Sequence, residues 1–286
     1  MAIAGSLFYD ANILFDLLSG RVVETLSAQS PKTSRYQNAK RILEIGQKLA
    51  IPGYASSFTY DLLERRIREV TDFIGDAIKS LIGTIRSAKL MTSSGKLERF
   101  DSATDLFILE DFVWERFRKI SRSRDWEKES LLLLEQLIVQ NIEDVLAKHG
   151  QSVDTQAVLD VLVEALRQFG VISDARKTEL ARLKLEVPQV DMTLDPPTLF
   201  MLKHKVGMMD DEDLAQLAVA LQQQNLRNRW TVVVSTDYRD IISARIPLFQ
   251  SLKLMCSGPL YAASHLRSLN KGAGPMPYPN KMSYVT

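Results

Sequence analysis

Two short apolar segments, one near each end of the chain, are each followed by an aspartate. Ser6-Leu-Phe-Tyr leads into Asp10, and the β-branched run Thr231-Val-Val-Val-Ser-Thr236 leads into Asp237. Runs of this length and composition are typical of strands buried on both faces, as in parallel sheets. Because helical patterns separate them, we expect an α/β unit whose two halves meet in space although most of the chain lies between them.

The first part of the chain alternates between helix and strand signals, which Ser, Asn, Gly and Pro punctuate. The expected elements are a helix over residues 12–18 that ends at Ser19-Gly20, a helix from Ser34 or Asn38 to about Lys48, a strand over residues 49–52, and a long helix from about Ser57. Pro52 limits the strand to a strand end, because proline cannot donate to a sheet ladder.

Residues 76–204 carry helical periodicity and are expected to form an all-helical insertion. One amphipathic stripe begins at residues 131–134 and ends before Gly150. Asp154 can cap the next helix, which ends at Gly170, and Ser173 starts another. Pro188 and Pro196-Pro197 then break the pattern. With about 18 basic and about 21 acidic residues, the insertion has no strong field, which favours contact with a protein over broad wrapping of RNA.

Strand and helix signals return in the last part of the chain. The expected elements are a helix over residues 213–221, a strand over residues 231–236, a strand over residues 251–256, and a helix from Pro259 to about Leu269. We therefore divide the chain into an α/β core formed by residues 1–75 and 205–269, the insertion at 76–204, and a tail at 270–286.

Composition excludes several classes of protein. With 45% hydrophobic and 25% charged residues, the 286-residue chain has ample material for a core. The single cysteine, Cys256, and the three histidines argue against a disulfide framework and a closed zinc site. No apolar run approaches the ~20 residues that span a bilayer, and the start of the chain lacks a secretory signal, so we expect a cytoplasmic protein without a membrane partner. The net charge of +1 gives no global attraction to nucleic acid.

Acidic residues follow both predicted strands and begin two of the predicted helices. Asp10 and Asp237 stand at the carboxyl ends of strands, where open parallel sheets bind ligands. Asp213 lies at the start of a helix, and Asp61 and Glu64 are three residues apart on one helix face. Hard cations such as Mg²⁺ or Mn²⁺ prefer carboxylate oxygens, and they activate water for attack on a phosphodiester.

Three segments resemble the PIN domain, a family of metal-dependent ribonucleases. Leu7-Phe-Tyr-Asp-Ala-Asn-Ile-Leu14 is similar to the opening strand with its Asp-x-Asn signature. Asp213-Leu-Ala-Gln-Leu-Ala-Val-Ala-Leu221 is similar to the third acidic position on an Ala-rich helix. Val232-Val-Val-Ser-Thr-Asp-Tyr-Arg-Asp240 is similar to the motif of a strand, Ser or Thr, and an acid. The resemblance covers roughly residues 1–75 and 205–269.

The resemblance implies a three-layer α/β/α core with a parallel sheet, interrupted here by the insertion. It implies a catalytic acidic site that holds Mg²⁺ or Mn²⁺ and hydrolyses RNA. By analogy, the acids are Asp10, Asp213, Asp237 and either Asp61 or Glu64, with Asn12, Ser235 and Thr236 in support and Asp240 as an additional acid. Asp61 fits the local pattern better, whereas the family more often has Glu at this place.

Two basic groups are candidates for contact with single-stranded RNA. Arg65, Arg66 and Arg68 lie close in sequence to the proposed site. The second group is interleaved with aromatic residues, a pattern that binds single strands by charge and stacking, and it consists of Arg116, Arg118, Lys119, Arg122 and Arg124. The simpler interpretation of both groups is a solvated helix surface.

Every acid also has a simpler structural interpretation. Asp10 can cap the following helix, Asp237 fits ordinary turn chemistry, and Asp213 fits a solvated helix start. Asp61 and Glu64 can pair with nearby arginines on a wet helix face.

The leading hypothesis for function is a metal-dependent endoribonuclease, a hydrolase that binds RNA and magnesium or manganese. The alternatives are a non-catalytic PIN-like scaffold whose insertion binds a protein, and a toxin-type ribonuclease of a toxin–antitoxin pair. Haloacid-dehalogenase-like phosphatases require Asp-x-Asp on the first strand, where this chain has Asp10-Ala-Asn12. Receiver domains carry a further acidic pair near the same place, which the sequence here does not resemble.

Overall fold

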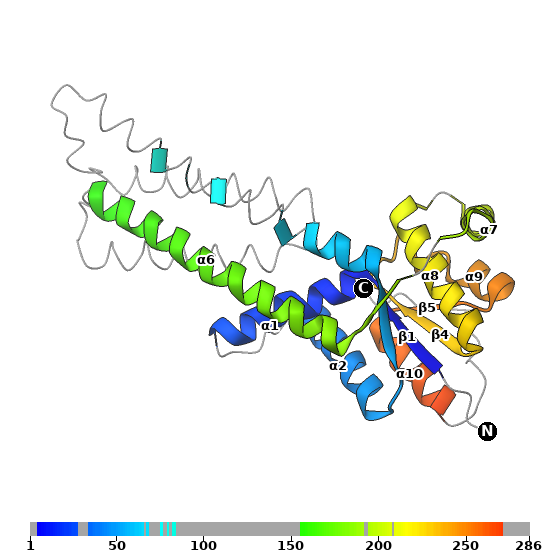
Figure 1. The fold of residues 1–286 in the computed structure, drawn as a ribbon. Coiled ribbons are helices and arrows are strands. Elements are labelled where there is room, and N and C mark those ends of the chain that lie inside the picture. Colours follow the sequence, from blue (N-terminus) through cyan, green and yellow to red (C-terminus); the bar gives the residue numbers. More distant parts are fainter. Residues whose placement is uncertain are drawn as a thin grey trace. The chain divides into compact units, whose positions relative to one another are not determined.

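The computed structural model describes residues 5–27, 34–65, 67–68, 75–76, 79, 82–83, 155–191, 194–207 and 209–270 (Figure 1). The chain forms two compact units. The first consists of Met1–Gly20, Pro31–Arg65 and Leu180–Thr286, and the second of Arg21–Ser30 and Arg66–Glu179. The first unit thus takes in residues 180–204, which the sequence analysis placed in the insertion.

The first unit is built on a five-stranded parallel sheet in the order β3-β2-β1-β4-β5. Its strands are β1 (Gly5–Tyr9), β2 (Gly53–Ser56), β3 (Gln189–Val190), β4 (Trp230–Val234) and β5 (Met255–Ser257). The expected α/β class with a parallel sheet is therefore confirmed. Strand β1, from the start of the chain, lies in the centre and pairs with β4 over its whole length, Gly5 opposite Trp230 and Tyr9 opposite Val234.

Helices pack on both faces of this sheet. The helices with residues in this unit are α1 (Ala11–Ser27), α2 (Ser34–Lys48), an unlabelled helical segment at 57–65, the end of α6 (Thr155–Glu186), α7 (Pro196–Val206), α8 (Asp211–Arg227), α9 (Arg245–Leu252) and α10 (Pro259–Asn270). On one face, Phe8, Val233 and Cys256 join a core with buried side chains of α7, α8 and α9. On the other face, α10 contacts β1, β4 and β5 and packs against α2.

The central strands are apolar because both of their faces are covered. Leu7, Phe8, Val232 and Val233 are at most 1% exposed. The few hydroxyl groups inside the sheet pair with one another, as Ser6 Oγ and Thr231 Oγ1 do at 2.9 Å. Buried hydroxyl groups need such partners, because an unpaired polar group in the core is costly.

Two helices continue where glycine was expected to end them. Helix α1 runs through Ser19-Gly20 to Ser27, because the missing side chain of Gly20 gives room to the buried ring of Tyr36 on α2. A Cβ on Gly20 would lie 2.1 Å from Cδ2 of that ring. Helix α6 runs through Gly170, which is exposed, so glycine costs only its intrinsic helix penalty there. The predicted breaks at these positions are therefore wrong.

Proline marks element starts in this fold more often than ends. Strand β2 begins after Pro52, whose carbonyl accepts a hydrogen bond from Leu7 N–H at 2.9 Å, so the strand predicted at 49–52 is displaced. Pro196 and Pro197 occupy the first turn of α7 behind the cap Asp195, and the predicted break in the helical pattern lies before them, between Glu186 and Pro196. Strand β3 and helices α7 and α9 were not predicted.

Other predicted elements are confirmed with small shifts of their ends. Helix α2 begins at Ser34, the helical segment after β2 begins at Ser57, and α10 begins at Pro259. Strand β5 begins at Met255, later than the predicted start at residue 251, because α9 continues to Leu252. The stripe at 131–146 and the tail after residue 270 lie outside the described residues.

In the second unit, the described residues are helical, and most of them belong to the 155–179 part of α6. Exposed ion pairs run along this helix, such as Arg167 Nη2 with Glu164 Oε1 at 2.6 Å. None of the helices in the described residues is both long enough and apolar enough to cross a membrane.

The contact between Gly20 and Tyr36 makes a testable prediction for stability. Gly20→Ala forces the buried ring to move, which we expect to lower the free energy of unfolding by about 1–3 kcal/mol. Gly170→Ala is the matched control: it also places a methyl group inside a helix, but nothing lies within 4 Å of it, so stability should rise by about 0.5–1 kcal/mol. Thermal or urea unfolding of both variants checks this, and equal effects of the two would contradict it.

Candidate metal centre

The candidate centre lies at the carboxyl ends of β1 and β4. From β1 the strand order runs through β2 and β3 on one side and through β4 and β5 on the other. Crevices at such a reversal, outside the carboxyl ends of the strands, are the preferred ligand sites of open parallel sheets. Asp10 follows β1 directly, and Ser235, Thr236 and Asp237 follow β4.

Asp10 is held in a fixed position although it is buried, with 2% of its surface exposed. Its Oδ1 accepts a hydrogen bond from Ala11 N–H at 2.7 Å, and its Oδ2 accepts hydrogen bonds from Ser235 Oγ at 2.6 Å and from Asn12 Nδ2 at 3.2 Å. Its backbone carbonyl accepts hydrogen bonds from Ile13 and Leu14 N–H, so Asp10 lies at the N-cap position of α1. Donors of this kind stabilise a carboxylate that water cannot reach.

Ser235 connects the two strand ends. Its fully buried hydroxyl group donates to Asp10 and accepts a hydrogen bond from Asp237 N–H at 2.8 Å. Asp237 Oδ1 in turn accepts from the N–H groups of Arg239 and Asp240, each at 2.9 Å, which closes a turn. The turn chemistry expected for Asp237 is therefore present, and it brings Asp240 next to Asp237. Thr236 is half-buried between Ser235 and Asp237.

Three carboxylates converge in front of this frame. Asp213, Asp237 and Asp240 each offer an oxygen atom, and these atoms all lie within 4.8 Å of one another. We call these three residues the acidic group. Asp213 comes from the first turn of α8, whose N-cap Asp210 accepts a hydrogen bond from Asp213 N–H at 2.8 Å. The structure thus brings Asp213 and Asp237 together, with Asp240 as the third member.

The acidic group is electrostatically strained as long as no cation neutralises it. Burial and the negative charges of Asp10, Asp210, Asp237 and Asp240 raise the pKa of Asp213 to about 8. At neutral pH, Asp213 therefore carries a proton that a bound cation would displace. The N-terminus of α8 offsets only part of this repulsion, since a helix dipole acts as about half a unit charge.

The two candidates for the second acid lie outside the acidic group. Glu64 forms an ion pair with Lys184 Nζ at 2.5 Å, and both side chains are partly exposed. Asp61 is exposed and lines a pocket with Arg65, Glu212 and other residues. Neither residue belongs to the group of close carboxylates that the described part of the chain forms.

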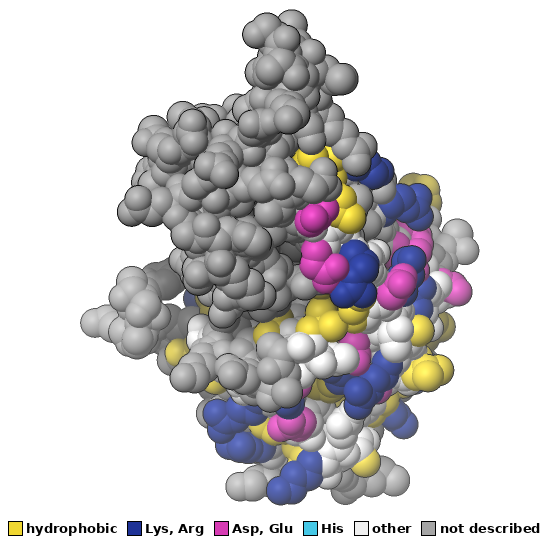
Figure 2. Space-filling view, turned by 90° about the vertical axis from the view of Figure 1, so that its left-hand side faces the viewer, with side chains coloured by type: hydrophobic (Ala, Val, Ile, Leu, Met, Phe, Trp, Pro, Cys, Tyr) yellow, Lys and Arg dark blue, Asp and Glu magenta, His cyan; other side chains and the backbone are white. Residues whose placement is uncertain are grey.

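The predicted RNA-contacting residues are mostly beyond what the structure describes. Arg65 binds Glu212 with an N–O distance of 2.5 Å, and Arg68 is exposed. Arg66, Arg116, Arg118, Lys119, Arg122 and Arg124 lie outside the described residues. On the face that Figure 2 shows, basic and acidic side chains of the described residues are interspersed. That mixture fits the net charge of +1.

A chain of hydrogen-bonded polar side chains next to Asp213 was not predicted from the sequence. Gln216 is 3% exposed, and its Oε1 accepts a hydrogen bond from Thr59 Oγ1 at 3.0 Å, while Thr59 Oγ1 lies 2.8 Å from Ser56 Oγ. These contacts join the end of β2 to α8 one turn after Asp213. A signal existed in the sequence: Gln216 is the one polar residue between Asp213 and Gln222, and it lies three positions after Asp213 on the same helix face.

The donor set fits a hard divalent cation. It offers carboxylate oxygens from two separate elements, supported from behind by hydrogen-bonded Asp10, and Mg²⁺ and Mn²⁺ are bound in this way by one or two carboxylates plus water. In comparisons with known proteins, no protein-family model, curated protein or solved structure matches this chain.

The frame behind the acidic group depends on Ser235. Ser235→Ala removes a donor to the buried Asp10 carboxylate, which we expect to lower the free energy of unfolding by about 1–3 kcal/mol. Ser243→Ala serves as the control, because its hydroxyl group is exposed and donates only to nearby backbone carbonyls. Urea unfolding of both variants measures the difference, and similar effects would contradict the assigned role.

The raised pKa of Asp213 predicts how stability changes with pH. Between the ordinary carboxyl pKa of 3.8 and about 8, the folded metal-free protein keeps a proton here that the unfolded chain loses. This group therefore lowers the free energy of unfolding as pH rises through that window. Asp213→Asn removes the effect. In EDTA, the melting temperature of the variant relative to that of wild type should therefore increase as the pH rises toward 8.

The control for this measurement is Asp211→Asn, which removes a carboxylate with 92% of its side chain exposed from the same helical turn. If Asp211→Asn and Asp213→Asn follow the same pH dependence, the electrostatic strain does not reside at Asp213.

Proposed function

We propose that this protein is a metal-dependent endoribonuclease of PIN type that hydrolyses RNA phosphodiester bonds. The observation that carries the proposal is the convergence of Asp213, Asp237 and Asp240 within 4.8 Å at the switch point of a parallel sheet. The residues Asp10, Asn12 and Ser235 support it, because they form a hydrogen-bonded frame where β1 and β4 end.

Mg²⁺ or Mn²⁺, when bound, supplies a nucleophilic water and neutralises charge on the phosphodiester. In this proposal, Asp213 and Asp237 hold the cation, and Asp240 completes the ligand set or orients water. Asp10, buried and hydrogen-bonded, adds negative charge behind them and fixes the loop after β4 through Ser235. On the face that Figure 2 shows, the charges of the described residues are interspersed and form no broad basic surface for wrapped RNA.

A second candidate function, a non-catalytic scaffold of the same fold, is favoured by one observation. Glu64 is engaged by Lys184, and Asp61 stands outside the acidic group, so the site as described has one acid fewer than the resemblance implies. In that case the insertion would carry the function by binding a protein partner. A toxin-type ribonuclease would share the catalytic site and differ only in its partner.

The test of catalysis compares the wild-type protein with ligand variants on end-labelled single-stranded RNA in the presence of Mn²⁺ or Mg²⁺. Substituting a residue that only hydrogen-bonds to a metal ligand lowers metal affinity or activity roughly 10- to 100-fold. Substituting a ligand itself, as in Asp213→Asn or Asp237→Asn, should therefore reduce cutting by at least about 100-fold. Asp191→Asn is the control, because it removes an exposed carboxylate outside both the acidic group and the pocket beside the start of α8, and it should keep activity.

Equal cutting by all four proteins would point to a contaminating nuclease and would contradict the proposal. Calorimetric titration with Mn²⁺ in the absence of RNA separates the two candidates. A wild-type protein that binds the cation through Asp213 and Asp237 but cuts no RNA would favour the scaffold.

A further inference from the structure

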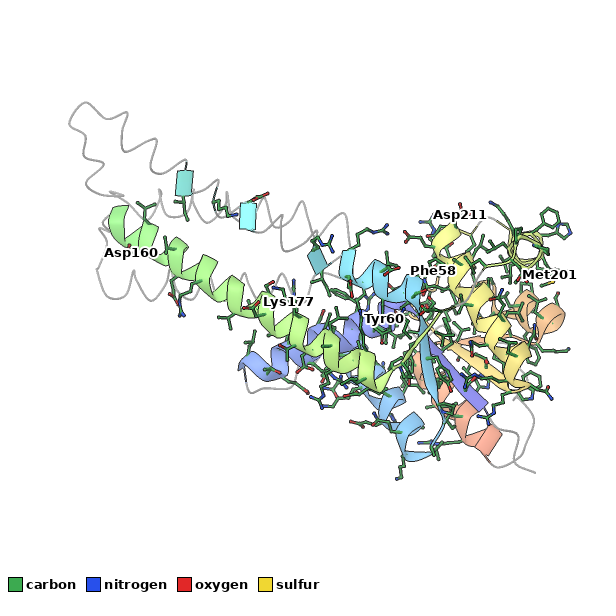
Figure 3. All side chains as sticks on the ribbon, viewed as in Figure 1. Phe58, Tyr60, Asp160, Lys177, Met201 and Asp211 are labelled. Carbon is green, nitrogen blue, oxygen red and sulfur yellow. The ribbon has the colours of Figure 1, made fainter. Side chains whose placement is uncertain are left out.

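A pocket of about 370 Å³ is lined in part by the first turns of α8, the helix that also carries Asp213 of the acidic group. It lies between the helical segment 57–65 and the start of α8, and Figure 3 shows Phe58 there, near the end of α8 that carries Asp211. Phe58, Leu62 and Ala215 give it an apolar wall, and Asp61, Glu212 and Gln216 contribute polar groups. Gln216 and Asp213 lie three residues apart on one helix face, so pocket and acidic group share a border.

Phe58 is an unusual residue for such a place. Its side chain is apolar and aromatic, yet 39% of the residue is exposed at the mouth of the pocket. Its helix is nevertheless well anchored, because the next two residues, Thr59 and Tyr60, are buried. Tyr60 also donates a hydrogen bond to the Val187 carbonyl at 2.6 Å. A fixed, accessible ring is a stacking surface for a flat ligand.

The charge of the pocket excludes some ligands. Asp61, Asp211 and Glu212 line it. Glu212 pairs with the one lining arginine, Arg65, at 2.5 Å, and Asp211 Oδ1 lies 3.6 Å from Lys203 Nζ. Three carboxylates against one lining arginine repel a phosphate, and Asp61 can accept hydrogen bonds from amino groups. The volume falls in the ordinary range of small-molecule sites, roughly 300–1,000 Å³, and so admits a planar base with its sugar.

We propose that this pocket takes an unstacked base of single-stranded RNA, from the nucleotide next to the phosphate held at the acidic group, and that the base stacks on Phe58. Single-stranded RNA is commonly recognised by bases that stack on aromatic side chains and bond along their edges. The carboxylates that line the pocket select bases with an exocyclic amino group. They accept a hydrogen bond from cytosine N4 and repel O4, the carbonyl oxygen that uracil carries at the same ring position. This proposal rests on the proposed function, since it takes the acidic group as the phosphate site.

The experiment measures binding of short fluorescent oligocytidylate and oligouridylate, made with hydrolysis-resistant phosphorothioate linkages, in the presence of Mg²⁺. Removing a stacking ring costs roughly 5- to 150-fold in affinity, so Phe58→Ala should weaken oligocytidylate binding by at least about fivefold. Phe58→Tyr keeps the ring and should bind like wild type. Wild type should prefer oligocytidylate to oligouridylate, and Asp61→Ala should reduce that preference.

The matched control is Phe200→Ala, which removes another exposed phenylalanine, 76% exposed on α7 and outside the lining of the pocket. Its affinity should equal that of wild type. Equal loss in Phe58→Ala and Phe200→Ala, or no loss in either, would overturn the proposal. A pocket that instead takes a side chain of a protein partner would leave both oligonucleotides unbound, which overturns it as well.

The two proposals fail in different ways. If wild-type protein cuts RNA in a manner that depends on Asp213 while Phe58→Ala binds and cuts normally, the base pocket is wrong and the nuclease stands. If no metal-dependent cutting occurs but oligocytidylate binding depends on Phe58, the nuclease is wrong and the chain is an RNA-binding module.

Discussion

The backbone pairing of β1 with β4 is the constraint on which the rest of the structure depends. It joins residues 5–9 to residues 230–234, and the two strands end side by side. Without this pairing, Asp10 and Ser235 would not meet, and the 2.6 Å hydrogen bond between them would not form. The site is therefore a product of tertiary folding, because no single stretch of the chain contains both halves of it.

The acidic group opposes this folding. Carboxylates within 4.8 Å of one another repel, and burial together with this repulsion raises the pKa of Asp213 to about 8. The surrounding structure compensates with backbone donors, because the N–H groups of Arg239 and Asp240 donate to Asp237 Oδ1. A site that is unfavourable when empty and favourable with a cation is typical of function more than of stability.

Much of the core was predictable from local pattern, whereas tight packing was not. The β-branched run before Asp237 and the aromatic run before Asp10 identified the two central strands, because buried parallel strands have few alternatives in composition. Gly20 and Gly170 were wrongly predicted to end helices. At Gly20 the glycine makes room for the ring of Tyr36, which belongs to a different helix and could not be identified from local sequence. Within the site, Asp240 was only an additional candidate, because its position beside Asp237 depends on a turn. Gln216 was missed, because its partner Thr59 lies far away in sequence.

The position of β1 also determines when the protein can fold during synthesis. Strand β1 occupies the middle of the sheet, with β2 on one side and β4, from much later in the sequence, on the other. One edge of β1 must therefore remain unpaired until residue 234 has left the exit tunnel. Such long-range pairing is slow, and exposed strand edges aggregate, so the nascent chain should depend on chaperones more than its size alone would require.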